Sequence, residues 1–267
     1  MKDYGICQLS VVAVRKNPGS TNEMVSQVLF GETFSIIKYE KKWSKISNQF
    51  DNYRGWINNS QIRFISKKEY QFLNTNESIY SLDKLGYIIN NKNEKIYLPL
   101  GSLVSSCDFL ETKFIGKKTN HIKNSIVKTV KLYLNTPYLW GGRTNYGIDC
   151  SGFSQIVYKI QNIKINRDAS QQALQGNIVR RKDSNKGDLA FFGDSNKKIT
   201  HVGLLLSINE VIHAYGKIRL DKINNEGIIN SETKKITHKL VEIRTYWLSN
   251  SWILAVINLN FWLSPTV

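Results

Sequence analysis

Residues Gly147 to Phe153 read GIDCSGF, and this stretch places one of only three cysteines between an aspartate and a serine, with glycine on both sides. Asp149 is a favourable helix N-cap, so we expect Cys150 in the first turn of a helix that continues through CSGFSQIVYKIQNI. The positive end of that helix favours the thiolate, which is the nucleophilic form of cysteine. Two interpretations therefore fit this stretch: a buried structural cysteine at a helix start, or an activated nucleophile whose flanking glycines let a substrate approach.

Two histidines that follow the helix favour the nucleophile. The chain has four histidines, and His201 in ITHVGLLL and His213 in EVIHAYG lie in neighbouring strand-like runs. A thiol peptidase needs a cysteine at a helix start, a histidine as base and a polar group that orients the histidine. A two-residue turn between the strands would put the two histidines on opposite faces of the sheet, whereas an odd-length turn around residues 208–210 would put them on one face.

The surrounding pattern indicates an α+β catalytic region preceded by β-rich modules. Residues 1–65 contain short strands with turns between them, which favours a small barrel, and residues 66–118 hold weaker strands that we expect to form a second, degenerate barrel. In residues 119–267, helical segments precede four strand-like runs, GDLAFFG, THVGLLLS, EVIHAYG and KLVEIRTYW. The final residues 246–267 carry no charged side chain, and alternation within them favours a closing strand over a membrane anchor.

The formal net charge of the 267-residue chain is +16, and its pI is about 9.6. The lysines are spread along the chain, and no basic stripe with interleaved aromatic residues is visible, so we expect no nucleic-acid partner. Cys7, Cys107 and Cys150 cannot all pair within the chain and have no zinc-site spacing, so we expect a free thiol and neither metal nor cofactor. The N-terminus lacks the apolar run of a signal peptide, which predicts a cytoplasmic protein or an exported one whose leader was removed. We expect a monomer without a membrane partner.

Six sequence blocks occur in order between residues 122 and 246: TPYLWGG, DCSGF, RDASQQ, GDLAFF, THVGLLL and VIHAYG. Through these blocks the chain resembles the NlpC/P60 cysteine peptidases, which cleave peptidoglycan stem peptides. The preceding β-rich region is similar to the bacterial SH3 domains of one branch, the γ-D-glutamyl-L-diamino-acid endopeptidases. The resemblance implies a papain-like catalytic domain behind one or two SH3-like barrels, with Cys150 as nucleophile, His201 as base and His213 as the residue that orients the base.

The resemblance also implies a set of substrate-binding residues. These residues are Tyr138, Asp149, Ser151, Arg167, Asp168, Tyr53 and Glu23. The tyrosine before the WGG loop would lie beside the oxyanion site, and the residues flanking the nucleophile would touch the substrate. Arg167 and Asp168 would face the charged end of the substrate, while Tyr53 and Glu23 would reach the cleft from the first barrel. Helix capping and aromatic packing are the structural alternatives for these positions.

We therefore expect a cysteine endopeptidase that hydrolyses the γ-D-Glu–L-diamino acid bond of muropeptides, acting on released peptides with a free N-terminal L-Ala. Two other functions stay open. An amidase or acyltransferase could use the same cysteine–histidine pair, and a non-catalytic cell-wall binding protein could use the SH3-like modules and the basic surface. The barrels and the RDASQQ block favour the peptidase, and the presence of Cys150, His201 and His213 together argues against a non-catalytic protein.

Overall fold

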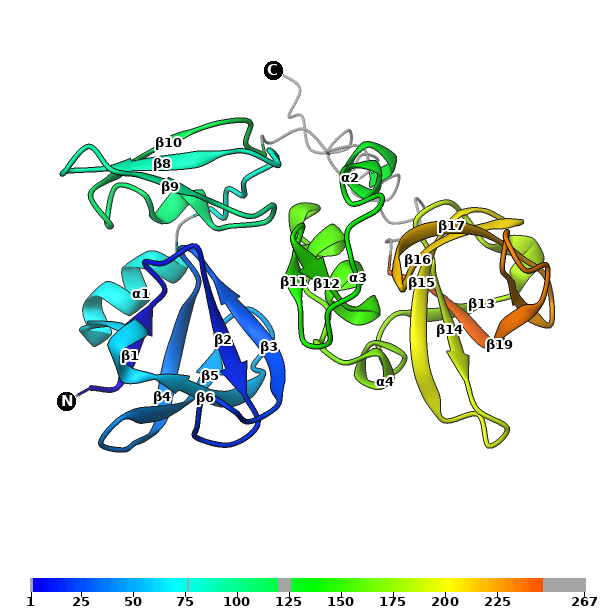
Figure 1. Cartoon of the computed structure of the whole chain (residues 1–267), viewed down its shortest axis with the longest axis horizontal. Helices are drawn as coiled ribbons and strands as arrows, with labels where there is room; N and C mark the ends of the chain where they lie inside the picture. Colours follow the sequence, from blue (N-terminus) through cyan, green and yellow to red (C-terminus); the bar gives the residue numbers. More distant parts are fainter. Residues whose placement is uncertain (1, 76, 120–125, 247–267) are drawn as a thin grey trace, which may run out of the picture.

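The structure, a computed structural model, describes residues 2–75, 77–119 and 126–246 of the chain. Figure 1 shows two β-rich bodies with helices between them and a smaller sheet beside the first body. The closing strand predicted within the uncharged tail lies outside the described residues. Among the residues that are described, no helix is long and apolar enough to span a membrane.

The first body is a seven-stranded antiparallel sheet, strongly curled, with the strand order β3-β2-β6-β5-β4-β1-β7 (Figure 1). Its strands are β1 (Tyr4–Ile6), β2 (Val11–Arg15), β3 (Met24–Leu29), β4 (Thr33–Tyr39), β5 (Trp43–Asn48), β6 (Arg54–Asn58) and β7 (Arg63–Ile65). Alternate side chains of β2 and β5 point inward, so Val12, Val14 and Ile46 share one core. The short strands therefore form the small barrel that the sequence predicts.

Residues 66–118 differ from the expected second barrel. They contain helix α1 and a three-stranded sheet of order β10-β8-β9. The bounds are α1 (Lys67–Thr75), β8 (Tyr87–Asn90), β9 (Lys95–Tyr97) and β10 (Thr112–Ile115). Strands of three or four residues leave too little sheet to close on itself, and the segment instead shares a hydrophobic core with the first body, since Ile88 and Leu110 pack in one cluster with Ile6 and Phe30.

The segment between the two β-rich bodies carries helices α2 (Ile126–Leu132), α3 (Cys150–Ile160) and α4 (Ala169–Gln172). Strands β11 (Arg143–Thr144) and β12 (Gly147–Ile148) lie between α2 and α3 in chain order. Every residue of α3 is buried, and its apolar side chains belong to the largest core cluster. Helix α3 is thus the central helix of the molecule, and it begins where the sequence predicts.

The second body is a closed, six-stranded antiparallel barrel, because β19 pairs with both β18 and β14. The strands are β14 (Leu189–Gly193), β15 (Ile199–Ser207), β16 (Glu210–Tyr215), β17 (Lys217–Ile223), β18 (Gly227–Ile229) and β19 (Ile236–Thr245), and β13 (Asn177–Val179) pairs with β19 from outside. Phe192, Leu205 and Ile228 pack inside the barrel, while Phe191 and Leu204 on the other face pack against the α3 cluster. Helices followed by antiparallel strands confirm the predicted α+β class.

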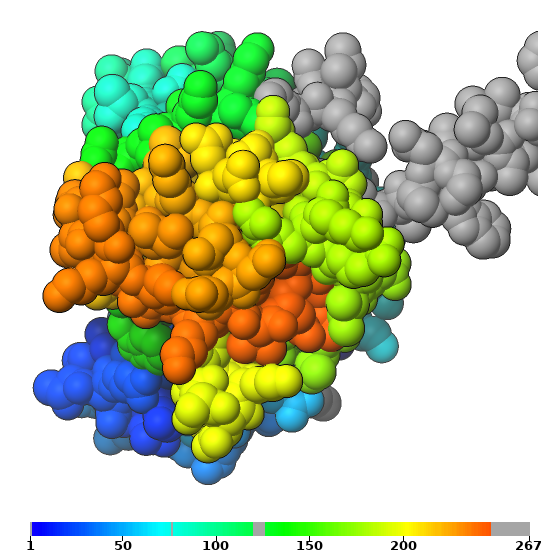
Figure 2. All heavy atoms as spheres, turned by 90° about the vertical axis from the view of Figure 1, so that its right-hand side faces the viewer, coloured from blue at the N-terminus to red at the C-terminus, as the bar shows by residue number. Residues whose placement is uncertain are grey.

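A buried ion cluster joins the first body to the helical segment. Glu32, in the turn between β3 and β4, accepts hydrogen bonds from Arg143 at 3.0 and 3.1 Å and pairs with the ammonium of Lys159 in α3. Burial alone would raise the pKa of Glu32, but the two cations lower it to about 2. In Figure 2 the second barrel (yellow to orange) faces the viewer, and the first body (blue) is visible behind and below it.

Candidate active site

Cys150 is the first residue of α3, and the side chain of Asp149 sets this position. Oδ1 of Asp149 accepts the backbone N–H of Gly152 at 2.7 Å, which confirms the predicted N-cap. The backbone N–H of Val202 hydrogen-bonds the sulfur of Cys150. The candidate nucleophile therefore lies against β15, the strand that also carries His201.

The glycines on either side of Cys150 make room for the protein chain. A Cβ atom at Gly152 would lie 2.3 Å from the carbonyl oxygen of Gly142, and a Cβ atom at Gly147 would lie 2.8 Å from the side chain of Leu139. Both distances are too short for a real side chain. The expected role of these glycines in substrate approach is therefore replaced by a packing role, because the preceding loop folds back over the helix start.

A β-bulge brings the two candidate histidines to one face of the barrel wall. The turn between β15 and β16 has two residues, with Ser207 opposite Glu210, and this turn alone would put His201 and His213 on opposite faces. The register shifts at Leu206, however, and this extra residue restores a common face. The convergence of the histidines thus comes from a bulge and not from an odd-length turn.

Three side chains form a hydrogen-bonded chain that begins at His201 on β15. Nε2 of His201 lies 2.8 Å from Nδ1 of His213, and Nε2 of His213 lies 2.9 Å from Oδ2 of Asp221. An ionised carboxylate only accepts, so Asp221 takes the N–H of His213, and the other nitrogen of His213 is left to accept the N–H of His201. Nδ1 of His201 then carries a lone pair and can act as a base. Asp221 was not predicted from the sequence.

Hydrogen-bond donors around Asp221 keep this carboxylate ionised. Burial alone would raise the pKa of Asp221, but hydrogen bonds from His213, Ser231 and Arg219 hold it well below its usual range. Nε of Arg219 donates to Oδ2 of Asp221 at 2.8 Å, and the backbone N–H of Ser231 donates to Oδ1 at 2.7 Å. The orientation of both histidines therefore depends on the Asp221 carboxylate, which three hydrogen-bond donors hold in position.

Burial keeps the candidate nucleophile and base neutral in the free protein. Burial and the neighbouring charge of Asp149 raise the pKa of the Cys150 thiol to about 12. Burial, together with His213 and His238, lowers the pKa of His201 well below 6.5. This differs from the thiolate expected at a helix start, because burial disfavours the charged form of the thiol.

Cys150 opens into a cleft of about 700 Å³ between the first body and the helical segment. The predicted residues that line this cleft are Glu23, Tyr53, Asp149, Ser151, Arg167 and Asp168. Burial, together with the nearby thiol of Cys150, raises the pKa of Tyr138 to about 12. The cleft is also lined by Trp140 and by the cations Lys16, Lys45 and Arg54, none of which was predicted.

Arg167 and Asp168 are adjacent in sequence but differ in their surroundings. Arg167 is buried and donates to both carboxylate oxygens of Asp149, at 3.0 and 2.6 Å, and to Ser151 at 2.9 Å, so its charge is balanced inside the protein. Asp168 accepts a hydrogen bond from Tyr53 across the cleft. Burial raises the pKa of Asp168, and nearby Arg167, which is already paired with Asp149, offsets this only in part.

Glu23 lies at the rim of the cleft and is already paired. Its Oε1 accepts the indole N–H of Trp140 at 2.8 Å, and its Oε2 lies 3.2 Å from the ammonium of Lys16. The hydrogen bond to Trp140 and the pairing with Lys16 lower the pKa of Glu23. Glu23 therefore holds the WGG loop against the first body, whatever contact it makes with a ligand.

Comparisons with known proteins agree with this geometry. The model of the NlpC/P60 family matches residues 135–237, and the model of the bacterial dipeptidyl-peptidase Sh3 domain matches residues 14–62. The chain carries an NlpC/P60 cysteine peptidase domain. The NlpC/P60 match includes Cys150, His201 and His213, and the SH3 match falls within the first body.

Relatives of this NlpC/P60 protein share both parts of the chain. A γ-D-glutamyl-L-lysine dipeptidyl-peptidase of Bacillus cereus is 24% identical, over 79% of this chain and 74% of the relative. A protein of the same name from Bacillus subtilis is 28% identical, over 72% of this chain and 73% of the relative. The crystal structure of a Bacillus cereus NlpC/P60 family protein aligns with a TM-score of 0.72 at 18% identity, over 91% of this chain and 99% of that one, so the two share a fold.

Proposed function

We propose that the protein is a cysteine endopeptidase that hydrolyses the γ-D-Glu–L-diamino acid bond of peptidoglycan stem peptides, and that it acts on released peptides with a free N-terminal L-Ala. The observation that carries this proposal is the pair formed by Tyr53 and Asp168 across the cleft beside Cys150. An incompletely balanced carboxylate close to a nucleophile suits a substrate that ends in an ammonium. The relatives named γ-D-glutamyl-L-lysine dipeptidyl-peptidase support the choice of bond.

The proposed reaction begins with a neutral thiol and a neutral imidazole. Nδ1 of His201 takes the proton of Cys150 as the sulfur attacks the γ-carbonyl carbon of D-glutamate. The backbone N–H of Cys150 and the nearby hydroxyl of Tyr138 would stabilise the oxyanion, and one such donor contributes about 3 kcal/mol. His201 then gives its proton to the leaving amine, and a water molecule, activated by the same nitrogen, hydrolyses the acyl-enzyme.

The proposed selectivity for a free amine follows from charge. Asp168 would accept the ammonium of L-Ala, with Tyr53 holding the carboxylate in position. The cations Lys45 and Arg54 on the first body would balance the α-carboxylate of D-glutamate in the same cleft. An acetylated or glycan-linked alanine has no charge for Asp168, and the first body would obstruct a long glycan. Released peptides are thus the substrates that fit this cleft.

The test compares L-Ala-γ-D-Glu-L-Lys with its N-acetylated form. The parent enzyme should cleave the free peptide at least tenfold faster in kcat/KM, and Asp168→Asn should lose most of that preference, because a buried ammonium without its carboxylate costs several kcal/mol. Asp108→Asn, an exposed carboxylate outside the cleft, is the matched control. Equal kcat/KM for the two peptides would show that the amine is not recognised.

The same assay separates the peptidase from the alternative functions. Cys150→Ala should abolish hydrolysis, whereas Cys7→Ala and Cys107→Ala, which change the two other buried cysteines, should keep it. Mass spectrometry of the products identifies the bond that is cut. Turnover by Cys150→Ala would overturn the mechanism, and cleavage of an acyl donor without release of the diamino acid would favour an acyltransferase.

A further inference from the structure

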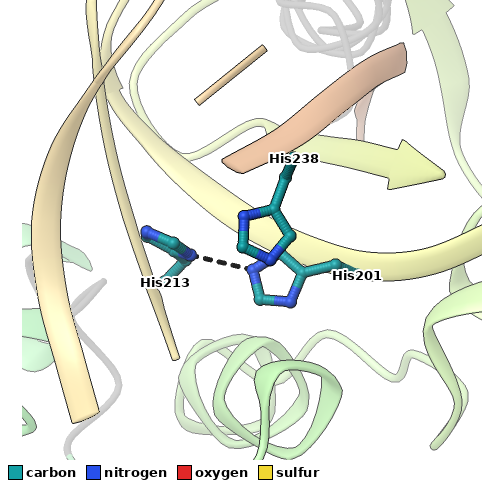
Figure 3. A group of neighbouring side chains, drawn as sticks. All are labelled: His201, His213 and His238. Carbon is teal, nitrogen blue, oxygen red and sulfur yellow. Dashed lines mark hydrogen bonds between the residues drawn. The ribbon is translucent and has the colours of Figure 1, made fainter. Parts of the chain in front are cut away.

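Three imidazoles converge at the end of the second barrel that faces α3. His201 comes from β15, His213 from β16 and His238 from β19, and one ring nitrogen from each lies within 4.8 Å of the other two (Figure 3). The peptidase mechanism uses the first two histidines but assigns no task to His238. The ring of His238 instead stacks on the ring of His201, with centroids 4.2 Å apart.

The nitrogens in this group are suitably placed to share a ligand. Nε2 of His201 and Nδ1 of His213 face each other at 2.8 Å, and Nδ1 of His238 bonds the hydroxyl of Thr237 at 2.9 Å, which leaves Nε2 of His238 for a ligand. Tetrahedral zinc at about 2.0–2.1 Å from each nitrogen separates its ligand atoms by roughly 3.4 Å. The hydrogen-bonded pair would open slightly, and the partly exposed ring of His238 would turn inward.

The surroundings of His213 already resemble those of a metal ligand. A histidine that binds zinc usually donates its other ring N–H to a carboxylate, which fixes the tautomer and the direction of the lone pair. His213 makes this bond to Asp221 at 2.9 Å, and Arg219 holds the carboxylate in turn. The lone pair of Nδ1 therefore points into the histidine group before any ion arrives.

We propose that His201, His213 and His238 form a reversible zinc site that switches the peptidase off. Zinc on Nε2 of His201 displaces the hydrogen bond to His213, and the proton of the neutral ring must then sit on Nδ1. That nitrogen can no longer accept the proton of Cys150, so attack stops while the thiol stays intact. The inhibition, though not the binding, rests on the proposed function.

Binding is tested on Cys150→Ala, which removes the thiol and keeps the three histidines. Calorimetric titration with zinc chloride should give one ion per chain, and zinc should raise the unfolding temperature. Introducing His238→Phe or His238→Asn into Cys150→Ala should weaken zinc binding by at least about tenfold, since one of the three zinc ligands is lost. His121→Phe is the control for the loss of one histidine. Cobalt(II) in place of zinc should give the visible absorption of a tetrahedral site.

Inhibition is measured as the ratio of peptidase activity with zinc to peptidase activity without zinc, separately for each protein. This ratio does not depend on how a substitution changes the activity without zinc. The parent enzyme should be inhibited, and His238→Phe should need at least about tenfold more zinc for the same loss. Zinc binding that disappears in Cys150→Ala would overturn the three-histidine site, because the thiol would then be the ligand. Equal affinity with and without His238 would overturn it too.

Discussion

Asp221 determines, through two successive hydrogen bonds, which nitrogen of His201 carries a proton. The carboxylate accepts from His213, and His213 then accepts from His201. Each of the two buried histidines therefore takes the tautomer that its hydrogen-bonded neighbour requires. At this scale the hydrogen-bonded group is a chain of three side chains, in which Asp221 sets the tautomer of His201 through His213.

Asp221→Asn should therefore reduce kcat far more than it changes KM. The amide can present its NH2 group to His213 and so stabilise the wrong tautomer in both rings. We expect kcat to fall on the order of 10²- to 10⁴-fold, the range that general-base catalysis supplies. The measurement is steady-state kinetics on the free tripeptide. Glu232→Gln, which removes the exposed partner of Arg219, should stay within about twofold, and a similar loss in both variants would contradict the tautomer argument.

The bulge in β15 decides at the scale of the element whether two distant histidines meet. Leu206 is the extra residue, with Leu205 opposite Val211 and Ser207 opposite Glu210. A ladder that continued regularly from the turn would turn His201 away from its partner. The bulge therefore absorbs Leu206, so that the strand beyond it keeps the register that places His201 and His213 on one face.

Two single-residue deletions in β15 should have opposite effects. Removing Leu206 leaves a regular hairpin with Leu205 and Ser207 in their present pairs, so the folded protein should keep kcat/KM within about tenfold of the parent. Removing Gly203 shifts His201 by one position and turns it to the other face, so activity should disappear. Circular dichroism checks that both proteins are folded. An active Gly203 deletion would show that the register is not what aligns the histidines.

The sequence predicted the elements that carry a strong local signal. The start of α3 followed from Asp149 as N-cap, and strands β14, β15 and β16 followed from apolar runs. Strands β17 and β18 were missed because the stretch IRLDKINNEGII mixes charged and polar residues with its apolar ones. Asp221 and His238 were missed with them, since only closure of the barrel brings these residues to the first two histidines.

The cleft depends, at the scale of the whole molecule, on an ion cluster that no local pattern reveals. Glu32 pairs with Arg143 and with Lys159, and each partner lies more than a hundred residues further along the chain. All three side chains are buried. Their contact fixes the first body against α3. The walls of the cleft come from both, so its width depends on this contact.

Glu32→Gln should destabilise the protein strongly, because it leaves two buried cations without their carboxylate. We expect the free energy of unfolding to fall by about 3–5 kcal/mol at pH 7. The pKa of Glu32 is about 2 in the folded protein, below its usual value near 4.5, so its stabilisation is present above pH 4.5 and is lost as the pH falls towards 2.

Urea unfolding of the parent protein and Glu32→Gln at pH 7 and pH 3 measures this effect. The difference between the two proteins should shrink at the lower pH. Glu40→Gln, which breaks an exposed pair with Lys38 at 2.7 Å, is the control and should change stability by less than about 1 kcal/mol. A difference that stays constant across this pH range would rule out ionised Glu32 as its source.

Closure of the second barrel also limits how a peptide can be held. Strand β15 pairs with β16 only from Gly203 onward, so residues 199–202, which include His201, pair with β14 alone and leave only a short stretch of unpaired backbone. Peptidases that bind substrates by strand addition depend on an extended backbone of α-linked residues. A protein that binds the end groups and side chains of its substrate does not require an extended, α-linked backbone. Under the proposed function, recognition by end groups would accommodate the D-configuration and the γ-linkage of the stem peptide.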